Sequence, residues 1–259
     1  MKRESRQQAI MDLLVAEGNV DLDSLAERFA VSRMTIHRDL DELEGAGLLR
    51  KVRGGATIES GTRFESDFRF RERQGGAAKS AMATAALDLV EPGMTVMIND
   101  GSMAALLGER LTAKRPLTVI TNNAAVIDAL KAEAGITLIA LGGLYSPKFN
   151  AFLGKVTEEA LETLRADIAF ISTPAVTGRE VFHMDEQVVR AKRLMMDKAR
   201  VRCLVVNHTR FGHAALYRLG ALAEFDHIIT DDRPGAETAR IFRDAGLTLT
   251  IATKDEAAE

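Results

Sequence analysis

Three short polar loops carry the residue types that bind anions and hydroxyl groups. Asn99-Asp100-Gly101-Ser102 follows an apolar stretch typical of a strand and precedes a helical pattern. Its glycine allows close approach to the backbone, and its N–H groups together with the Ser102 hydroxyl can hold an anion. Thr121-Asn122-Asn123 and Gly142-Gly143 follow the next two predicted strands. Glycine and asparagine are also ordinary turn residues, but three successive strands ending this way favour one small-molecule pocket.

A second group of residues is basic and lies within positions 20–55. Ser32 is a good N-cap for a helix whose buried stripe is Ile36, Leu40 and Leu43. The side chains predicted to bind DNA open this helix or form the hairpin after it: Ser32, Arg33, Met34, Thr35, His37, Arg38, Arg50, Lys51 and Arg53. The first turn of such a helix meets base edges in the major groove, and a basic, glycine-tipped wing follows the phosphate backbone.

Two other uses are open to such a module, namely a structural scaffold and a protein-interaction winged helix. A merely solvated helix face mixes charges of both signs. Here the acids Asp41, Glu42 and Glu44 lie toward the back of the helix, and the wing contains no acid. This separation of charge favours DNA binding.

The elements that position these residues fall into two domains. Residues 1–57 are predicted to form a winged helix-turn-helix, residues 58–76 a connector, and residues 77–259 an α/β domain with a mostly parallel sheet. The expected strands are 95–98, 117–121, 136–141, 168–172, 201–206, 228–230 and 247–251. The helical patterns between them are 79–90, 104–111, 124–134, 157–164, 186–199 and 236–245. The connector carries Phe64, Phe68 and Phe70, so we expect it to dock on one of the domains.

Composition limits the classes of function that are open. The chain has 259 residues, is 46% hydrophobic and carries a net charge of -3, so affinity for nucleic acid must come from a local patch. Cys203 is the one cysteine and lies in an apolar run, which excludes a disulfide framework or zinc cluster. We find no secretory h-region and no membrane-spanning run, and expect a cytoplasmic protein that does not bind membranes.

The sequence shows no set of catalytic residues and no metal site. His183 lies near Asp185 and Glu186, but one histidine with two acids lacks the spacing of a metal centre. His183 is interpreted as a loop residue, and Glu186 as a ligand contact or a helix-cap contact. No nucleophile, base and orienting group occur together, and no cofactor is expected.

Residues 31–56, VSRMTIHRDLDELEGAGLLRKVRGGA, resemble the DNA-binding signature of the DeoR family of bacterial regulators. His37 stands where the family usually has arginine, which leaves the operator preference open. The resemblance continues to about Asp232 through the polar loops, the segment containing Glu186, and the segment NHTRFG. Asn207 and Arg210 occupy the places of Asp and Lys in the family's D-x-x-K-F pattern, and an arginine can still pair with phosphate.

This resemblance implies a sensor domain similar in fold to ribose-phosphate isomerase, which binds phosphorylated sugars or polyols. It implies an effector site at Asn99, Asp100, Gly101, Ser102, Thr121, Asn122, Gly142, Gly143, Glu186, Asn207 and Arg210. The expected protein is a repressor that binds a double-stranded operator as a homo-oligomer, either a dimer or a tetramer. The alternative is a sugar-phosphate isomerase-like enzyme carrying a DNA-binding module. Asn99 and Asn207, where carboxylates would serve catalysis, count against this alternative.

Overall fold

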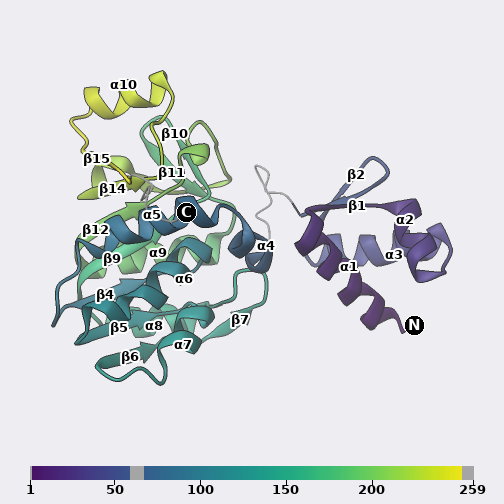
Figure 1. Ribbon diagram of the computed structural model, residues 1–259, viewed down its shortest axis with the longest axis horizontal. Helices are drawn as coiled ribbons and strands as arrows, with labels where there is room; N and C mark the ends of the chain where they lie inside the picture. Colours follow the sequence, from purple (N-terminus) through teal and green to yellow (C-terminus); the bar gives the residue numbers. More distant parts are fainter. Residues whose placement is uncertain (1, 59–66, 253–259) are drawn as a thin grey trace, which may run out of the picture. The chain divides into compact units, whose positions relative to one another are not determined.

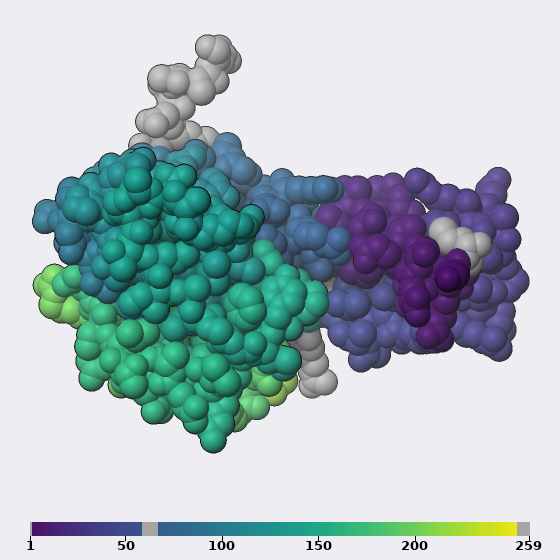
Figure 2. Space-filling model, turned by 90° about the horizontal axis from the view of Figure 1, so that it is seen from below, coloured from purple at the N-terminus to yellow at the C-terminus, as the bar shows by residue number. Residues whose placement is uncertain are grey.

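The computed structural model describes residues 2–58 and 67–252, and the chain divides into two compact units, Met1–Gln74 and Gly75–Glu259. Figure 1 shows the elements of both units, and Figure 2 shows their packed surfaces, purple to blue for the first unit and blue through green to yellow for the second. None of the helices in the described part of the chain is both long and apolar enough to cross a membrane.

The first unit is a winged helix-turn-helix. It contains α1 (Arg3–Glu17), β1 (Asn19–Asp21), α2 (Leu22–Phe29), α3 (Arg33–Gly45), β2 (Arg50–Val52), β3 (Gly55–Thr57) and α4 (Phe68–Arg73). The three strands form an antiparallel sheet in the order β1-β3-β2. A single core of buried side chains joins the three N-terminal helices to this sheet, and Ile10, Leu14, Ile36 and Leu40 in it are fully buried.

The connector expected at residues 58–76 includes an ordered helix. Asp67 caps α4 by accepting a hydrogen bond from the backbone N–H of Arg69. Phe70 packs against the core of the first unit, and the Arg69 guanidinium lies 3.2 Å from the Asp12 carboxylate of α1. The first unit therefore extends to Gln74, whereas the sequence placed its end at residue 57, because short helices lack a readable apolar period. Phe64 lies outside the described residues.

The second unit is built on a seven-stranded parallel sheet in the order β15-β14-β12-β9-β4-β5-β6. Its strands are β4 (Thr95–Ile98), β5 (Leu117–Thr121), β6 (Ile136–Ala140), β9 (Ala166–Ser172), β12 (Ala199–Val205), β14 (His227–Thr230) and β15 (Leu249–Ile251). All seven were predicted from the sequence to within two residues at each end. The fold class is therefore confirmed.

Helices cover both faces of this sheet (Figure 1). They are α5 (Gly76–Leu87), α6 (Ser102–Arg110), α7 (Ala124–Leu130), α8 (Lys155–Glu162), α9 (Glu186–Lys198) and α10 (Ala236–Asp244). One core contains side chains of α5, α6 and α7, and the other contains those of α8, α9 and α10. Strand side chains alternate between these cores, as Val96 and Ile98 do with Met97, because successive residues of a strand face opposite ways.

Short strands outside the parallel sheet complete the second unit. The strands β7 (Leu144–Ser146) and β8 (Ala151–Leu153) form a hairpin, and β10 (Ala175–Thr177), β11 (Glu180–His183) and β13 (Tyr217–Ala221) form a small antiparallel sheet. The described residues of this unit also form the 3-10 turns η1 (Leu111–Lys114), η2 (His208–Arg210) and η3 (Leu222–Glu224). His183, interpreted from the sequence as a loop residue, is the buried last residue of β11.

Candidate functional sites

The helix-turn-helix is fixed by a cap at the start of each helix. Asp21 caps α2 by accepting hydrogen bonds from the backbone N–H groups of Asp23 and Ser24, and the bond from Ser24 is the main cause that lowers the pKa of its carboxyl. Ala30 ends α2 in the left-handed region, with φ of 52°. Ser32 then caps α3, because its hydroxyl accepts from the backbone N–H of Thr35 at 3.2 Å. This geometry matches the N-cap that the sequence predicted.

The first two turns of α3 divide cleanly into an outward and an inward face. Arg33, Met34, His37 and Arg38 are exposed, and Met34 retains 62% of its accessible surface. The inward positions of the helix are Ile36, Asp39, Leu40 and Leu43. Among the described residues, one ion pair lies at the exposed front of this helix, and it joins Arg33 to Asp23 of α2 at 2.8 Å. The outward face therefore presents basic groups and one large apolar side chain.

Asp39 is a buried acid on the inward face of α3, and Arg6 of α1 binds it. The Arg6 Nε donates to Asp39 Oδ2 at 2.5 Å, and its Nη2 donates to Oδ1 at 3.1 Å. The hydrogen bond to Asp39 raises the pKa of Arg6, so the guanidinium stays charged. A two-point contact of this kind fixes direction as well as distance, so it sets how α3 lies against α1.

The wing is the hairpin formed by β2, β3 and the turn between them, and its basic residues have different surroundings. Arg50 and Arg53 are exposed, whereas the Lys51 ammonium pairs with Asp41 of α3. The backbone N–H of Lys51 also donates to Glu44 at 2.7 Å, which attaches the start of the wing to α3. A Cβ at Gly55 would lie 1.9 Å from the Val20 carbonyl oxygen, so only glycine allows β1 and β3 to pair here.

One polar loop of the second unit lies where the strand order reverses. The neighbours β4 and β9 are central: β5 and β6 extend from β4 on one side, and β12, β14 and β15 extend from β9 on the other. In open parallel sheets ligands bind outside the carboxyl ends of the strands at such a point. The loop 99–102 after β4 and Ser172 at the end of β9 both lie there.

A buried network joins these two strand ends. The Asn99 amide donates to the Ser172 hydroxyl at 3.2 Å and its oxygen accepts from the Ser172 backbone N–H. Lys192 of α9 donates to the Ser172 carbonyl at 2.9 Å, and its ammonium lies 3.4 Å from the Asp100 carboxylate. The Lys192 and Asp100 side chains are each only 2% exposed. Much of the hydrogen-bonding capacity of Asn99 and Asp100 is thus directed into the protein.

The adjacent loop after β5 is bonded to the same region. Thr121 donates its hydroxyl proton to the Ile98 carbonyl at 2.8 Å, and the Asn123 amide donates to the Gly101 carbonyl at 3.1 Å. Asn122 donates to the Phe152 carbonyl at 2.9 Å, while its side-chain oxygen is buried without a hydrogen-bond partner among the described residues. Gly101, at φ 105°, precedes α6, whose first residue Ser102 is buried and whose start has no side-chain cap.

The other predicted effector residues are more dispersed. Gly142 and Gly143 follow β6 and are exposed; the Gly142 carbonyl accepts from the Thr157 hydroxyl of α8 at 2.6 Å. Glu186 is the exposed first residue of α9 and pairs with Arg190 at 2.6 Å. Neither glycine nor Glu186 lines a cavity described for this part of the chain.

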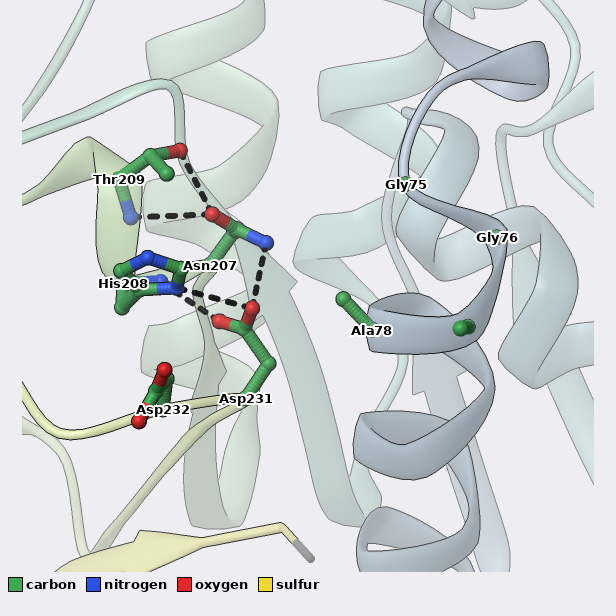
Figure 3. A pocket seen from close by; sticks show the side chains of 9 residues that line it. Gly75, Gly76, Ala78, Asn207, His208, Thr209, Asp231 and Asp232 are labelled. Atoms are coloured by element: carbon green, nitrogen blue, oxygen red, sulfur yellow. Dashed lines mark hydrogen bonds and ion pairs between the residues drawn. The ribbon is translucent and has the colours of Figure 1, made fainter. Parts of the chain in front are cut away.

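Asn207 lines an open cavity of about 420 Å³ at the carboxyl ends of β12 and β14. Figure 3 shows the first turn of α5 on one side of the cavity and the loops containing His208 and Asp231 on the other. The Asp231 carboxylate accepts from the Asn207 amide at 2.9 Å and from the His208 backbone N–H at 2.7 Å. The His208 Nδ1 lies 2.9 Å from the same carboxylate. Arg210 ends the turn η2 and does not line this cavity.

Several residues of these sites were not predicted from the sequence, including Lys192, Ser172, His208 and Asp231. A signal for Lys192 was present, because it occupies a position on the apolar stripe of α9 that is otherwise formed by Val188, Ala191, Met195 and Met196. A lysine at such a position is seldom buried without a partner. The other three residues could be assigned to the sites only from the strand order of the sheet, which brings their loops together.

Comparison with known proteins decides the family. Residues 6–62 match the DeoR-like helix-turn-helix domain, and residues 75–232 match the DeoR C terminal sensor domain. The chain belongs to the DeoR family. It is a transcriptional regulator with a DNA-binding domain followed by a sensor domain, as the resemblance predicted.

Two curated relatives align along nearly the whole chain. The uncharacterized HTH-type transcriptional regulator YgbI of Escherichia coli (strain K12) is 30% identical over 250 residues, which cover 96% of this chain and 98% of the relative. The glycerol-3-phosphate regulon repressor of the same strain is 26% identical over 252 residues, which cover 97% of this chain and 100% of the relative.

Similarity to solved structures is lower. A D-ribose-5-phosphate isomerase in complex with phospho-erythronic acid has 16% identity and a TM-score of 0.37, over 51% of this chain and 52% of that one. This similarity supports no statement about activity. The fold assignment rests on the strand order of the sheet and on the family.

Proposed function

We propose that this protein is a repressor of a carbohydrate or polyol catabolic operon, and that a phosphorylated sugar or polyol controls it. The observation that carries the DNA-binding part is the outward face of α3, where Arg33, His37 and Arg38 are exposed beside Met34. An arginine on a recognition helix can make two hydrogen bonds to guanine, and an exposed apolar side chain can contact a thymine methyl group.

The decisive test for DNA binding is Arg38→Ala in a gel-shift titration with the operator. We expect the affinity to fall by about tenfold or more, because a base-reading arginine contributes roughly 1–3 kcal/mol. Lys131→Ala, which removes an exposed cation of the sensor domain, is the matched control and should leave the affinity unchanged. Equal affinities of Arg38→Ala and the parent protein, both folded, would exclude α3 as the recognition helix.

The sensor part of the proposal is supported by the position of loop 99–102 at the reversal of strand order and by the uncapped start of α6 at Ser102. Uncapped helix N-termini attract anions, and Asn122 supplies a buried acceptor for a ligand hydroxyl. The relative named for the glycerol-3-phosphate regulon makes a phosphorylated polyol the first class of compound to test. Gly142, Gly143, Glu186, Asn207 and Arg210 remain predicted contacts of this effector.

Calorimetry with a panel of sugar and polyol phosphates, each beside its unphosphorylated counterpart, tests the effector class. The phosphorylated member should bind more tightly, and Ser102→Asp should abolish its binding because a fixed carboxylate repels a phosphate. Ala113→Asp adds the same charge at an exposed position of this unit and serves as the control. A preference for the unphosphorylated compounds would overturn the phosphate-sensing proposal.

We further propose that the protein acts in the cytoplasm as a dimer or tetramer and catalyses no reaction on its effector. An operator with two half-sites requires two recognition helices, one from each of two chains. Analytical ultracentrifugation of the free protein tests the assembly, and incubation with pentose and hexose phosphates tests for turnover. A monomer that forms product would favour the enzyme instead.

A further inference from the structure

Met34 is an exposed apolar side chain of the helix-turn-helix that the core of the first unit does not use. It retains 62% of its accessible surface, and among the described residues of this unit Val52 of the wing is the other large apolar side chain that is exposed. The core takes Ile36, Leu40 and Leu43 from α3, but not Met34. Single exposed apolar residues are ordinary on protein surfaces, so the use of Met34 depends on the side chains around it.

The positions of these side chains on the helix place Met34 and Arg38 furthest from the core. Each residue turns an α-helix by about 100°, so Met34 and Arg38, each two residues from the buried Ile36, lie about 160° around the helix from it. They are four residues apart and therefore lie on the same face, separated by about 6 Å along the helix. Arg33 and His37 lie on one flank of this face, roughly 60° and 100° from Ile36.

The polar side chains next to Met34 already bond within the first unit. The Ser32 hydroxyl accepts from the backbone N–H of Thr35 at 3.2 Å, and the two hydroxyl oxygens lie 2.9 Å apart. The Arg33 guanidinium lies 2.8 Å from the Asp23 carboxylate of α2. Most of the Met34 side chain, in contrast, is exposed to solvent. Met34 is therefore the side chain of the first turn that reaches a base without breaking one of these interactions.

In the major groove, the apolar group that distinguishes one base from the others is the 5-methyl group of thymine. We propose that Met34 is a specificity-determining residue, which selects a thymine in each operator half-site through this methyl group. This role rests on the proposed function, in which the outward face of α3 meets the bases, and it adds which base is selected. A separation of about 6 Å on the helix is less than two base-pair steps of about 3.4 Å, so the thymine lies within about two steps of the base pair that Arg38 contacts.

Removal of single methyl groups from the operator tests this role. The operator is selected from a random duplex library with the full chain, and each thymine of one half-site is then replaced in turn by deoxyuridine, which lacks only the 5-methyl group. We expect one of these replacements to weaken binding of the parent protein by about fourfold, as for the exposure of one buried carbon group. Met34→Ala should bind this duplex and the unmodified operator equally, because the side chain that contacts the methyl group is gone.

Two control variants show whether the effect belongs to an apolar side chain at this position. Met34→Leu keeps an apolar side chain of similar volume and should keep the preference for thymine over deoxyuridine. Val52→Ala shortens the exposed apolar side chain of the wing and should also keep this preference. Met34 is exposed and alanine favours a helix, so Met34→Ala should leave α3 folded, which the midpoint of thermal unfolding checks.

Arg38→Ala, titrated in parallel, separates this role from the proposed function. A deoxyuridine effect of the same size in Met34→Ala and in the parent protein, or a parent protein that responds to none of the replacements, would overturn the role of Met34. If Arg38→Ala still loses operator affinity in that case, α3 remains the recognition helix and only the thymine contact is wrong. If Arg38→Ala and Met34→Ala both bind the operator as the parent protein does, the proposed function of α3 fails as well.

Discussion

The Arg6 guanidinium binds the Asp39 carboxylate at two points inside the first unit, and both side chains are almost completely buried. Asp39 directly follows Arg38, which is exposed on the outward face of α3. Two neighbouring residues therefore have different surroundings: Asp39 fixes α3 from within, and Arg38 is exposed where we propose that the helix meets DNA.

Removing one partner of this pair should strongly destabilise the DNA-binding unit. Arg6→Met leaves a buried carboxylate without its cation, and we expect a loss of about 3–5 kcal/mol in the free energy of unfolding. Arg3→Met, which breaks the exposed pair with Glu42, should cost about 1 kcal/mol or less. Urea titrations followed through amide resonances of α1 and α3 measure both. Similar losses in the two variants would contradict the role given to Asp39.

The two arginines of the wing should contribute more to DNA affinity than its lysine. Arg53 is exposed, whereas the ammonium of Lys51 is held by Asp41. Arg53→Ala should weaken binding to operator and random DNA alike, and reduce the slope of log affinity against log salt by about one for one lost phosphate contact. Lys51→Ala should change the slope less. A larger effect of Lys51→Ala would show that DNA displaces Asp41 from this lysine.

The buried pair of Lys192 and Asp100 should stabilise the sensor unit at the reversal of strand order. Lys192→Met should lower its free energy of unfolding by about 3–5 kcal/mol, since Asp100 would stay buried without its cation. Arg190→Met removes a neighbouring cation of α9 from an exposed pair, with an expected cost of about 1 kcal/mol or less. Urea titrations followed through amides of β4 and β9 distinguish the two. Equal losses of unfolding free energy in Lys192→Met and Arg190→Met would argue against a stabilising ion pair between Lys192 and Asp100.

Cys203 should be unreactive in the native protein. It lies in β12, is fully buried, and burial raises the pKa of its thiol, so the reactive thiolate is scarce at neutral pH. Because the chain has one cysteine, a colorimetric thiol reagent reports on this position alone. We expect no labelling until the sensor unit unfolds in urea. Rapid labelling of the folded protein would show that β12 opens in the native state.

The parallel sheet was readable from the sequence because each of its strands is a short apolar run between helical patterns. The strands β7, β8, β10, β11 and β13 were missed, because they lie outside the alternation of strands and helices from which the parallel sheet was predicted. The strand-end loops were located correctly. Which of their side chains bond within the protein, as Asn99 does with Ser172, depends on the neighbour order of the strands, which a single sequence does not show.

The division of α3 into two faces has a consequence for how regulators of this kind diverge. Positions 33, 34, 37 and 38 make no contribution to the buried core, whereas Ile36, Asp39 and Leu40 do. If these four positions contact DNA as proposed, substitutions there change the preferred operator at little cost to the buried core. The same scaffold can in this way acquire new target genes while its stability is preserved by a separate set of residues.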